Sequence, residues 1–204
     1  AGVLNILPGG GADAGEPIGR HMDIDMVSFT GSTATGKRFL GYAAESNAKE
    51  VVLEMGGKNP AIVMDDAENL DRVAQHLVNG AFWNMGENCS ASSRLIVHKD
   101  VKAELLERIG HHASQWNLGD PLDPETRLGA LVSKTHFDKV CSYLDKADNV
   151  LIGGDAKDGF VEATVVEVAG NDSLLARDEI FGPVISVIEI SGFDEAIAIA
   201  NDTD

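Results

Sequence analysis

The sequence predicts an α/β fold with largely parallel sheets, and two observations lead to this prediction. Apolar, β-branched runs recur along the chain, and stretches with helical spacing lie between them. Several of the runs are continuous rather than alternating in polarity, which is typical of strands buried on both faces of a sheet. Strands that alternate with helices in this way favour parallel pairing.

Seven runs are the expected strands. In chain order they are VLNIL (3–7), MVSFT (26–30), VVLE (51–54), AIVM (61–64), RLIV (94–97), TVVEV (164–168) and VISVIEI (184–190).

The expected helices follow from apolar residues three or four positions apart. The first covers residues 70–82, and Asp65 with Glu68 three positions later resembles a capping box ahead of it. We expect three further helices, over 101–113, 137–144 and 194–200. Trp83 and Trp116 are expected to pack at helix ends, and the adjacent His111 and His112 to lie on a solvated surface.

Length and charge narrow the class of protein. The 204 residues are enough for one substantial domain or two small ones. A net charge of −17 disfavours binding to nucleic acid or to anionic membranes, because both require a basic surface. No apolar run approaches the roughly 18 residues that span a membrane. The N-terminus lacks the features of a secretory signal, and the abrupt ends indicate a segment of a longer protein.

Cysteine usage indicates a reduced, cytoplasmic protein, because Cys89 and Cys141 alone do not make a disulfide framework. With two cysteines so placed, no zinc-type cluster and no metal site are expected.

Two glycine-bearing turns, LPGGGADAG (7–15) and FTGSTATG (29–36), each follow an expected strand. Such a turn points backbone N–H groups and a helix N-terminus at an anion, and a dinucleotide pyrophosphate is a common occupant. Alternatively, the glycines serve tight turns only, and Ser32 or Thr33 caps a helix. Neither turn matches the full G-x-G-x-x-G fingerprint, so both interpretations stay open.

Glu54 ends an expected strand and precedes Gly56 and Gly57. Open α/β sheets place ligands and catalytic groups at the carboxyl ends of strands, where a partly buried glutamate can act as a general base. The alternative is an exposed loop glutamate.

Cys89 lies between the helix at 70–82 and the strand at 94–97, among small and polar residues. A cysteine on such a connection can act as a nucleophile if backbone N–H groups or a dipole stabilise its thiolate. The alternative is a small hydrophobic residue in a core. Cys141 fits that alternative better, because it shares a helical face with Phe137 and Leu144.

The segment RDEIFGPV (177–184) offers Glu179, which can accept hydrogen bonds from a ribose diol, and Phe181, which can pack on a flat ring. The alternative is a surface turn with one core phenylalanine.

Four motifs together, FTGSTATG, LEMGGKNP, GENCSASSR and EIFGPV in this order, resemble the aldehyde dehydrogenase superfamily of NAD(P)-dependent enzymes. The resemblance covers essentially the whole chain. It implies an aldehyde-dehydrogenase-like α/β fold, truncated at both ends. Residues 1–54 would be the C-terminal part of a Rossmann-type NAD(P)-binding domain, and residues 55–204 most of the catalytic domain.

The resemblance also implies a mechanism. Cys89 matches the nucleophile that attacks the aldehyde carbonyl to give a thiohemiacetal, and a thioester remains after hydride leaves to the nicotinamide. Glu54 matches the general base that activates water to hydrolyse the thioester.

The implied cofactor is NAD or NADP. Gly31, Ser32 and Gly36 match the turn at the pyrophosphate, and Met55 and Gly56 match backbone near the nicotinamide. Glu179 matches the carboxylate that holds the nicotinamide ribose, with Phe181 near the ring. Lys139 falls where some relatives contact the adenosine ribose.

The chain departs from the family pattern at several points. The family's second oxyanion donor, an asparagine, and its adenine-ribose lysine lie upstream of this chain. Glu87 stands where many relatives carry Gln, and Ser92, where many carry Gly, is expected to stiffen the nucleophile loop.

The resemblance implies oxidation of a small-molecule aldehyde to a carboxylate by an enzyme that is a homo-oligomer at full length. The stretches at 114–129 and 173–184 are similar to those of enzymes for aminoaldehydes, including γ-glutamyl-aminobutyraldehyde and betaine aldehyde. Two alternatives stay open. The thioester could be passed to coenzyme A, which Glu54 argues against, or the chain could be a non-catalytic fragment for folding or assembly.

Overall fold

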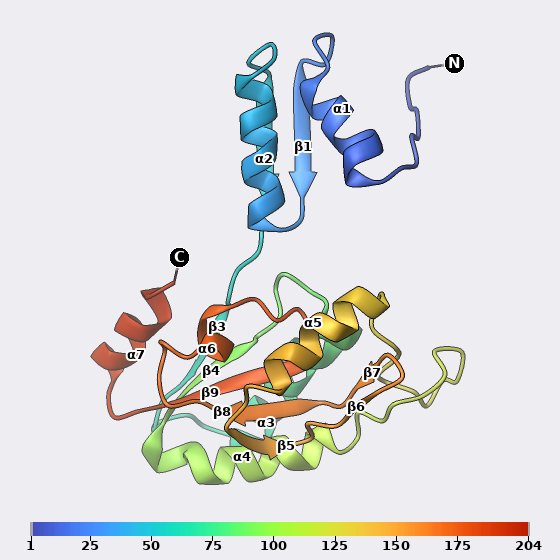
Figure 1. The fold of residues 1–204 in the computed structure, drawn as a ribbon. Coiled ribbons are helices and arrows are strands. Elements are labelled where there is room, and N and C mark those ends of the chain that lie inside the picture. Colours follow the sequence, from blue (N-terminus) through green and yellow to red (C-terminus); the bar gives the residue numbers. More distant parts are fainter. Residues whose placement is uncertain (1, 204) are drawn as a thin grey trace. The chain divides into compact units, whose positions relative to one another are not determined.

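The computed structural model describes residues 2–203 (Figure 1). The chain divides into two compact units, Ala1–Gly56 and Gly57–Asp204. The division falls after Gly56, whereas the family resemblance implies a domain boundary after Glu54. Each unit is described by itself.

The first unit is a single βαβ crossover preceded by two short helical turns. Strands β1 (Met26–Thr30) and β2 (Glu50–Glu54) pair in parallel, with Met26 opposite Glu50 and Thr30 opposite Glu54. Helix α2 (Thr33–Ala44) connects them, and the turns before β1 are η1 (Gly11–Gly15) and α1 (Glu16–Arg20). The two strands end together at the edge where α2 begins.

An aromatic cluster holds this unit together. Phe39 of α2 is buried, and its ring centroid lies 4.9 Å from that of Phe29 on β1 and 5.7 Å from that of Tyr42. Lys49 is also buried, and its Nζ donates to the Gly19 carbonyl at 2.6 Å and to Ser46 Oγ at 2.8 Å. The aromatic contacts bind α2 to β1, and Lys49 joins the start of β2 to α1.

The run at 3–7 is not a strand, so this part of the prediction is wrong. Val3, Leu4 and Ile6 are almost fully exposed. An extended segment becomes a strand only when a neighbour pairs with its N–H and C=O groups. Strands β1 and β2 pair with each other, and no described strand pairs with residues 3–7.

The second unit is built on a five-stranded sheet with the order β3-β4-β9-β8-β5. The first four strands are parallel, and β5 joins β8 in antiparallel orientation. This arrangement confirms the predicted largely parallel sheet. The strands are β3 (Pro60–Val63), β4 (Arg94–His98), β5 (Asn149–Ile152), β8 (Thr164–Glu167) and β9 (Val184–Ile190).

Helices cover both faces of this sheet (Figure 1). On one face, Leu95 and Val97 of β4 share a core with α3 (Leu70–Phe82) and α4 (Lys99–Ala113). On the other face, β4 and β9 contribute Ile96 and Ile190 to a cluster with α7 (Phe193–Asn201), and β8 contributes Val166 to a cluster with α5 (Lys134–Leu144) and α6 (Leu174–Arg177). Every residue of β4 is buried, as its continuous apolar run predicts.

Several short elements carry no signal that the sequence analysis detected. These are α1, the edge strand β5, α6, and the hairpin of β6 (Ala156–Lys157) with β7 (Phe160–Val161). They are too short, or too exposed, to show a periodic apolar pattern. The capping-box prediction is wrong, because Asn69 caps α3 by accepting a hydrogen bond from Arg72 N at 3.1 Å.

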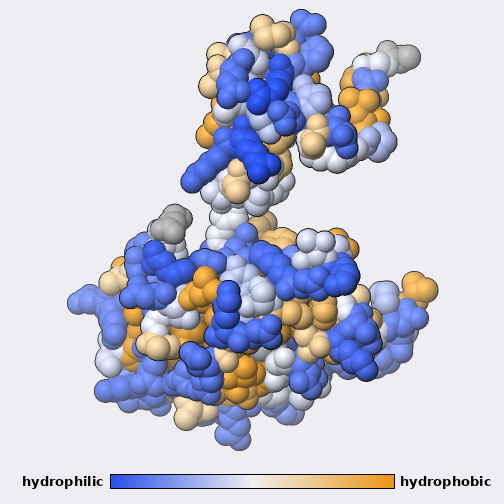
Figure 2. All heavy atoms as spheres, in the orientation of Figure 1, coloured by the Kyte–Doolittle hydropathy of each residue, from blue (hydrophilic) through white to orange (hydrophobic). Residues whose placement is uncertain are grey.

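Polar side chains dominate much of the face shown in Figure 2, with smaller apolar patches between them. Within residues 2–203, no helix combines the length and the apolar character needed to cross a bilayer.

The connection from α3 to β4 begins with a strained turn, η2 (Trp83–Gly86). Asn84, Met85 and Gly86 have φ values of 51°, 56° and 69°, and such left-handed conformations cost about 1–2 kcal/mol for each non-glycine residue. A Cβ atom on Gly86 would overlap the carbonyl group of Gly182, which lies just before β9. The backbones of two connections therefore touch, and only glycine fits at the contact.

Replacing Gly86 with Ala is expected to destabilise the second unit by roughly 3 kcal/mol or more, because the methyl group adds strain and displaces the backbone at Gly182. Urea unfolding of the chain, followed by the fluorescence of Trp83 and Trp116, measures the change. Gly110→Ala in α4 is the matched control, because a Cβ there meets only Ile152 at an ordinary 3.6 Å. Equal stabilities of the two variants would contradict the contact.

Lys58, immediately before Asn59 and β3, is a buried amine with no hydrogen-bond partner for Nζ among the described residues. Its exposed fraction is 6%. Burial, with a smaller contribution from the positive charge of Arg94, lowers the pKa of Lys58 from 10.5 to about 8. Burial of an unpaired ammonium group is unfavourable, so the protonated form destabilises the folded unit.

Lys58→Met is therefore expected to stabilise the chain by up to roughly 3 kcal/mol at pH 7, which corresponds to the difference between a pKa of 10.5 and about 8. The unfolded chain binds this proton more tightly than the folded one. The full free-energy cost of burying the protonated amine therefore applies below pH 8, and this cost disappears as the pH rises to 10.5. Urea unfolding at pH 7 and pH 10.5 measures the gain, with the exposed Lys134→Met as control. A gain that does not change with pH would contradict this account.

Candidate active site

A small cavity in the second unit brings together three residues that the sequence singles out. Cys89, Glu179 and Phe181 all line it, together with Gly57. Cys89 precedes β4, Glu179 and Phe181 precede β9, and Gly57 precedes β3. Because β3, β4 and β9 are parallel neighbours, these segments meet at the amino-terminal edge of the sheet.

Asn59 fixes the segment that carries Cys89. Its Nδ2 donates to the carbonyl of Cys89 at 2.7 Å and to that of Ala91 at 3.3 Å, and its own carbonyl accepts from Arg94 N at 3.2 Å. Asn59 is not among the site residues predicted from the sequence. The available signal was an amide side chain directly before Pro60 at the start of a strand.

Asn88 shapes the turn at the thiol. Its Oδ1 accepts hydrogen bonds from Ser90 N at 3.2 Å and Ser90 Oγ at 3.1 Å, and it lies 3.9 Å from Cys89 Sγ. The backbone of the segment is thereby ordered, while the thiol of Cys89 stays exposed.

The two thiols differ in their exposure and in their surroundings. Cys141 is half-buried on α5, and burial, with the nearby carboxylates of Asp145 and Asp138, raises its thiol pKa. A raised pKa lowers the fraction of reactive thiolate. Cys89 carries the more exposed thiol of the two.

Ser92 fits its position without left-handed strain, because it is not among the described residues with positive φ. Its N–H donates to the Gly80 carbonyl at 3.2 Å, and its Oγ would lie 3.2 Å from a Cβ on Gly80. The loop therefore does not need glycine at Ser92, but it does pack closely on the glycine of α3.

The turn before β9 is held at several points. Glu179 Oε1 accepts from Gly57 N at 3.4 Å, and the carbonyl of Glu179 accepts from Lys139 Nζ at 2.9 Å. Phe181 has a φ of 61°, so it is a third left-handed non-glycine residue near this site, after Asn84 and Met85. Lys139, which the family resemblance assigns to the adenosine ribose, here bonds the backbone of the turn itself.

The predicted residues of the first unit lie where β1 and β2 end. Gly31 N donates to the Glu54 carbonyl at 3.0 Å, which joins the two strand ends. Ser32 caps α2, because its Oγ accepts from Thr35 N at 3.3 Å. The helix-cap interpretation of Ser32 is therefore confirmed, and it leaves the turn exposed at the start of α2.

The side chain of Met55 lies against Gly36 of α2. A Cβ on Gly36 would lie 2.5 Å from Met55 Sδ. The carboxylate of Glu54 is exposed rather than partly buried in this unit, and Gly56 ends the unit.

Trp83 differs from its expected packing role, because 63% of it is exposed. Trp116 does pack, with its ring centroid 6.0 Å from that of Phe82. Trp83 is the last residue before the left-handed turn that leads to Cys89, and its exposure follows from that change of chain direction.

One group of side chains, Asp65, His98 and Asp100, has ligand atoms close enough together for a metal ion. Both ring nitrogens of His98 already have hydrogen-bond partners. Nε2 bonds the Ser191 carbonyl at 3.0 Å, and Nδ1 accepts from Asp100 N at 3.4 Å at the start of α4. The ring is thus a helix cap, and we assign no metal site.

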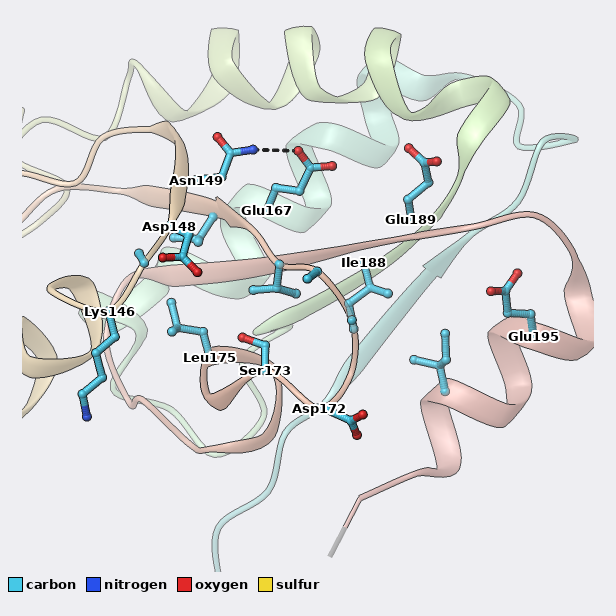
Figure 3. A pocket seen from close by; sticks show the side chains of 16 residues that line it. Lys146, Asp148, Asn149, Glu167, Asp172, Ser173, Leu175, Ile188, Glu189 and Glu195 are labelled. Atoms are coloured by element: carbon cyan, nitrogen blue, oxygen red, sulfur yellow. Dashed lines mark hydrogen bonds between the residues drawn. The ribbon is translucent and has the colours of Figure 1, made fainter.

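A larger groove of about 1030 Å³ contains none of the predicted residues (Figure 3). Carboxylates surround it, among them Glu167, Glu189 and Glu195, and Asn149 Nδ2 donates to Glu167 Oε2 at 2.9 Å. Lys102 forms ion pairs with Glu167 and Glu189. Of these two cavities among the described residues, the smaller one contains the thiol of Cys89 and the ring of Phe181.

Comparisons with known proteins agree on one family. The model of the aldehyde dehydrogenase family matches residues 1–204. The aminoacetaldehyde dehydrogenase of Pseudomonas aeruginosa is 65% identical over all of this chain, and the chloroplastic betaine aldehyde dehydrogenase of Beta vulgaris is 40% identical. The chain spans 42% of the length of each of these two relatives.

Solved structures give the same result. A γ-glutamyl-γ-aminobutyraldehyde dehydrogenase from Burkholderia cenocepacia matches 93% of the chain at 45% identity with a TM-score of 0.90, using 40% of its own length. An indole-3-acetaldehyde dehydrogenase complexed with NAD+ matches the whole chain at 42% identity with a TM-score of 0.96, using 43% of its length. The chain therefore belongs to the aldehyde dehydrogenase family.

Proposed function

We propose that the full-length protein is an NAD(P)-dependent dehydrogenase that oxidises an aldehyde to its carboxylate. The observation that carries this proposal is the cavity shared by an exposed thiol, Cys89, with Glu179 and Phe181. A nucleophile beside a diol-binding carboxylate and an aromatic ring is the arrangement that such a reaction needs.

Cys89 captures the substrate in this scheme. Its thiolate attacks the aldehyde carbonyl carbon, and the carbonyl oxygen of the resulting thiohemiacetal carries negative charge. No described residue accepts a hydrogen bond from the backbone N–H of Cys89, so this group can donate to that oxygen. Hydride then leaves, and an acyl thioester remains on Sγ.

The cofactor, when bound, accepts the hydride. The residues of this chain fit such a group: Glu179 can accept hydrogen bonds from the nicotinamide ribose, and Phe181 can pack near the ring. The exposed residues Gly31 and Ser32 lead into α2, whose first turn includes the buried Gly36 and whose first N–H groups and dipole attract a pyrophosphate. In this proposal, the backbone of Met55 and Gly56 lies near the nicotinamide, and Lys139 contacts the adenosine ribose.

Glu54 is the proposed base for deacylation. Its carboxylate is exposed in the first unit, and in this role it takes a proton from the water that attacks the thioester. Hydrolysis releases the carboxylate product and regenerates the thiol.

For the substrate we propose an aminoaldehyde. The relative at 65% identity is named for aminoacetaldehyde, and the relatives also include betaine aldehyde and γ-glutamyl-γ-aminobutyraldehyde dehydrogenases. The exposed indole of Trp83, six residues before Cys89, supports this choice, because an indole face attracts ammonium groups.

The decisive experiment is NAD+ reduction by the full-length gene product with aminoacetaldehyde, with the carboxylate identified by mass spectrometry. Carboxylate formation without coenzyme A supports the proposal. Acyl-coenzyme A as the product, or no reduction with any aldehyde offered, would overturn it.

Cys89→Ala is expected to lower aldehyde oxidation by roughly 10³-fold or more, because no thioester can form. Glu54→Gln is expected to slow deacylation by about 10²-fold, so that the acyl group accumulates on Cys89. Incubation with an activated acetyl ester, followed by intact and peptide masses, locates the acyl group. Cys141→Ala is the matched control and should label normally. Labelling of Cys141 to the same extent as Cys89 would refute the assignment.

Trp83→Ala is expected to raise KM for aminoacetaldehyde about fivefold to thirtyfold, the range of a cation–π contact worth 1–2 kcal/mol. KM for propanal, which carries no charge, should change much less. Steady-state kinetics with both aldehydes make the comparison. An equal rise in both KM values would show that Trp83 does not recognise the ammonium group.

A further inference from the structure

Side chains on one face of α5 contact the turn before β9, residues 178–183. Tyr143 donates its hydroxyl to Asp178 Oδ2 at 2.8 Å, and Lys139 Nζ donates to the Glu179 carbonyl at 2.9 Å. One turn closer to the helix start, His136 Nε2 lies 2.6 Å from the Phe181 carbonyl oxygen. Three side chains, spaced one helical turn apart, thus bond three successive points of the turn.

His136 also reaches the segment that carries Cys89. Its Nε2 lies 3.4 Å from Oε1 of Glu87, which is two residues before Cys89. The side chains of His136 and Glu87 are only 14% and 8% exposed. Glu87 Oε1 also accepts from Val132 N at 3.0 Å, just ahead of α5. The carboxylate is therefore held in place to face the ring.

The hydrogen-bond chemistry assigns the proton on His136. A carbonyl oxygen can only accept, so Nε2 must carry a hydrogen to bond Phe181 at 2.6 Å. The same nitrogen lies 3.4 Å from Glu87 Oε1, and Glu87 and Phe181 belong to the two connections that meet where Gly86 touches Gly182. The backbone contact brings the connections together, and His136 touches both, with a hydrogen bond to one and a 3.4 Å contact to the other.

We propose that His136 is a positioning residue whose ring joins the Phe181 turn to the Cys89 segment, through the Nε2–H hydrogen bond to the Phe181 carbonyl and the 3.4 Å contact of Nε2 with the Glu87 carboxylate. It would thereby keep the thiol and the nicotinamide side of the cavity at the separation that hydride transfer requires. The inference rests on the proposed function, but the link itself exists in the chain without cofactor or substrate. It can therefore be tested with and without catalysis.

Two variants at one position separate the donor from the bulk of the ring. His136→Leu removes the N–H, while His136→Gln places an amide N–H at a similar reach from the backbone. His111→Leu, an exposed histidine on α4, is the matched control for a His-to-Leu change on a helix.

Without cofactor, hydrogen exchange reports the link directly. The Val184 N–H, bonded to the Gly182 carbonyl at 2.7 Å, lies at the end of the turn. We expect faster exchange of peptides covering 178–184 and 84–90 in His136→Leu, and exchange close to the wild type in His136→Gln and His111→Leu. Unchanged exchange in His136→Leu would overturn the proposal.

With the full-length enzyme, His136→Leu should lower kcat by about tenfold to a hundredfold, the cost of a small misplacement of reacting groups. KM for the aldehyde and acetyl-ester labelling of Cys89 should stay within about threefold of the wild type, because neither requires the Phe181 turn. His136→Gln should recover most of kcat.

Three results would overturn the proposal: a kcat in His136→Leu equal to that in His111→Leu, no recovery in His136→Gln, or equal losses of kcat and labelling. A wild-type enzyme without NAD(P)+-dependent oxidation would overturn the proposed function instead, and the exchange result would still decide whether the link exists.

Discussion

The backbone contact between Gly86 and Gly182 is the constraint on which the candidate site depends. It exists because the connections before β4 and β9 precede neighbouring parallel strands and must start at the same edge of the sheet. The contact is close enough that neither chain can shift without the other. Strained residues on both sides, Met85 and Phe181 among them, persist because the surrounding sheet and helices hold them.

In the two units, the candidate site residues lie at opposite ends of the strands. In the first unit, the glycine turn at Gly31 lies at the carboxyl edge, where α2 begins and its dipole favours an anion. In the second unit, the Cys89 segment and the Phe181 turn lie at the amino edge, and the Cys89 segment follows the end of α3. At that edge, amide and imidazole side chains, Asn59 and His136, order the loops.

Several residues of the candidate site were predicted from the sequence. The hydrogen bonds and contacts that join these residues to other segments were not. Cys89, Glu179 and Phe181 lie in short motifs, and each has a chemical property that can be recognised locally. Asn59, Glu87 and His136 act through partners 30 to 49 residues away, and no local pattern indicates such a partner. The exposure of Trp83 was missed for a related reason, since a helical pattern cannot reveal that the chain turns left-handed at the next residue.

The sequence by itself determined the elements that carry strong periodicity. Helix α3 and strand β9 begin and end where their apolar patterns do, because burial of those patterns drives their formation. The tertiary structure decided what depends on a partner distant in the chain. Residues 3–7 have a strand-like composition but no paired neighbour, while β5 is a strand because β8 lies beside it. Backbone hydrogen bonds between strands, and the meeting of two loops at one sheet edge, depend on pairing that a single segment does not encode.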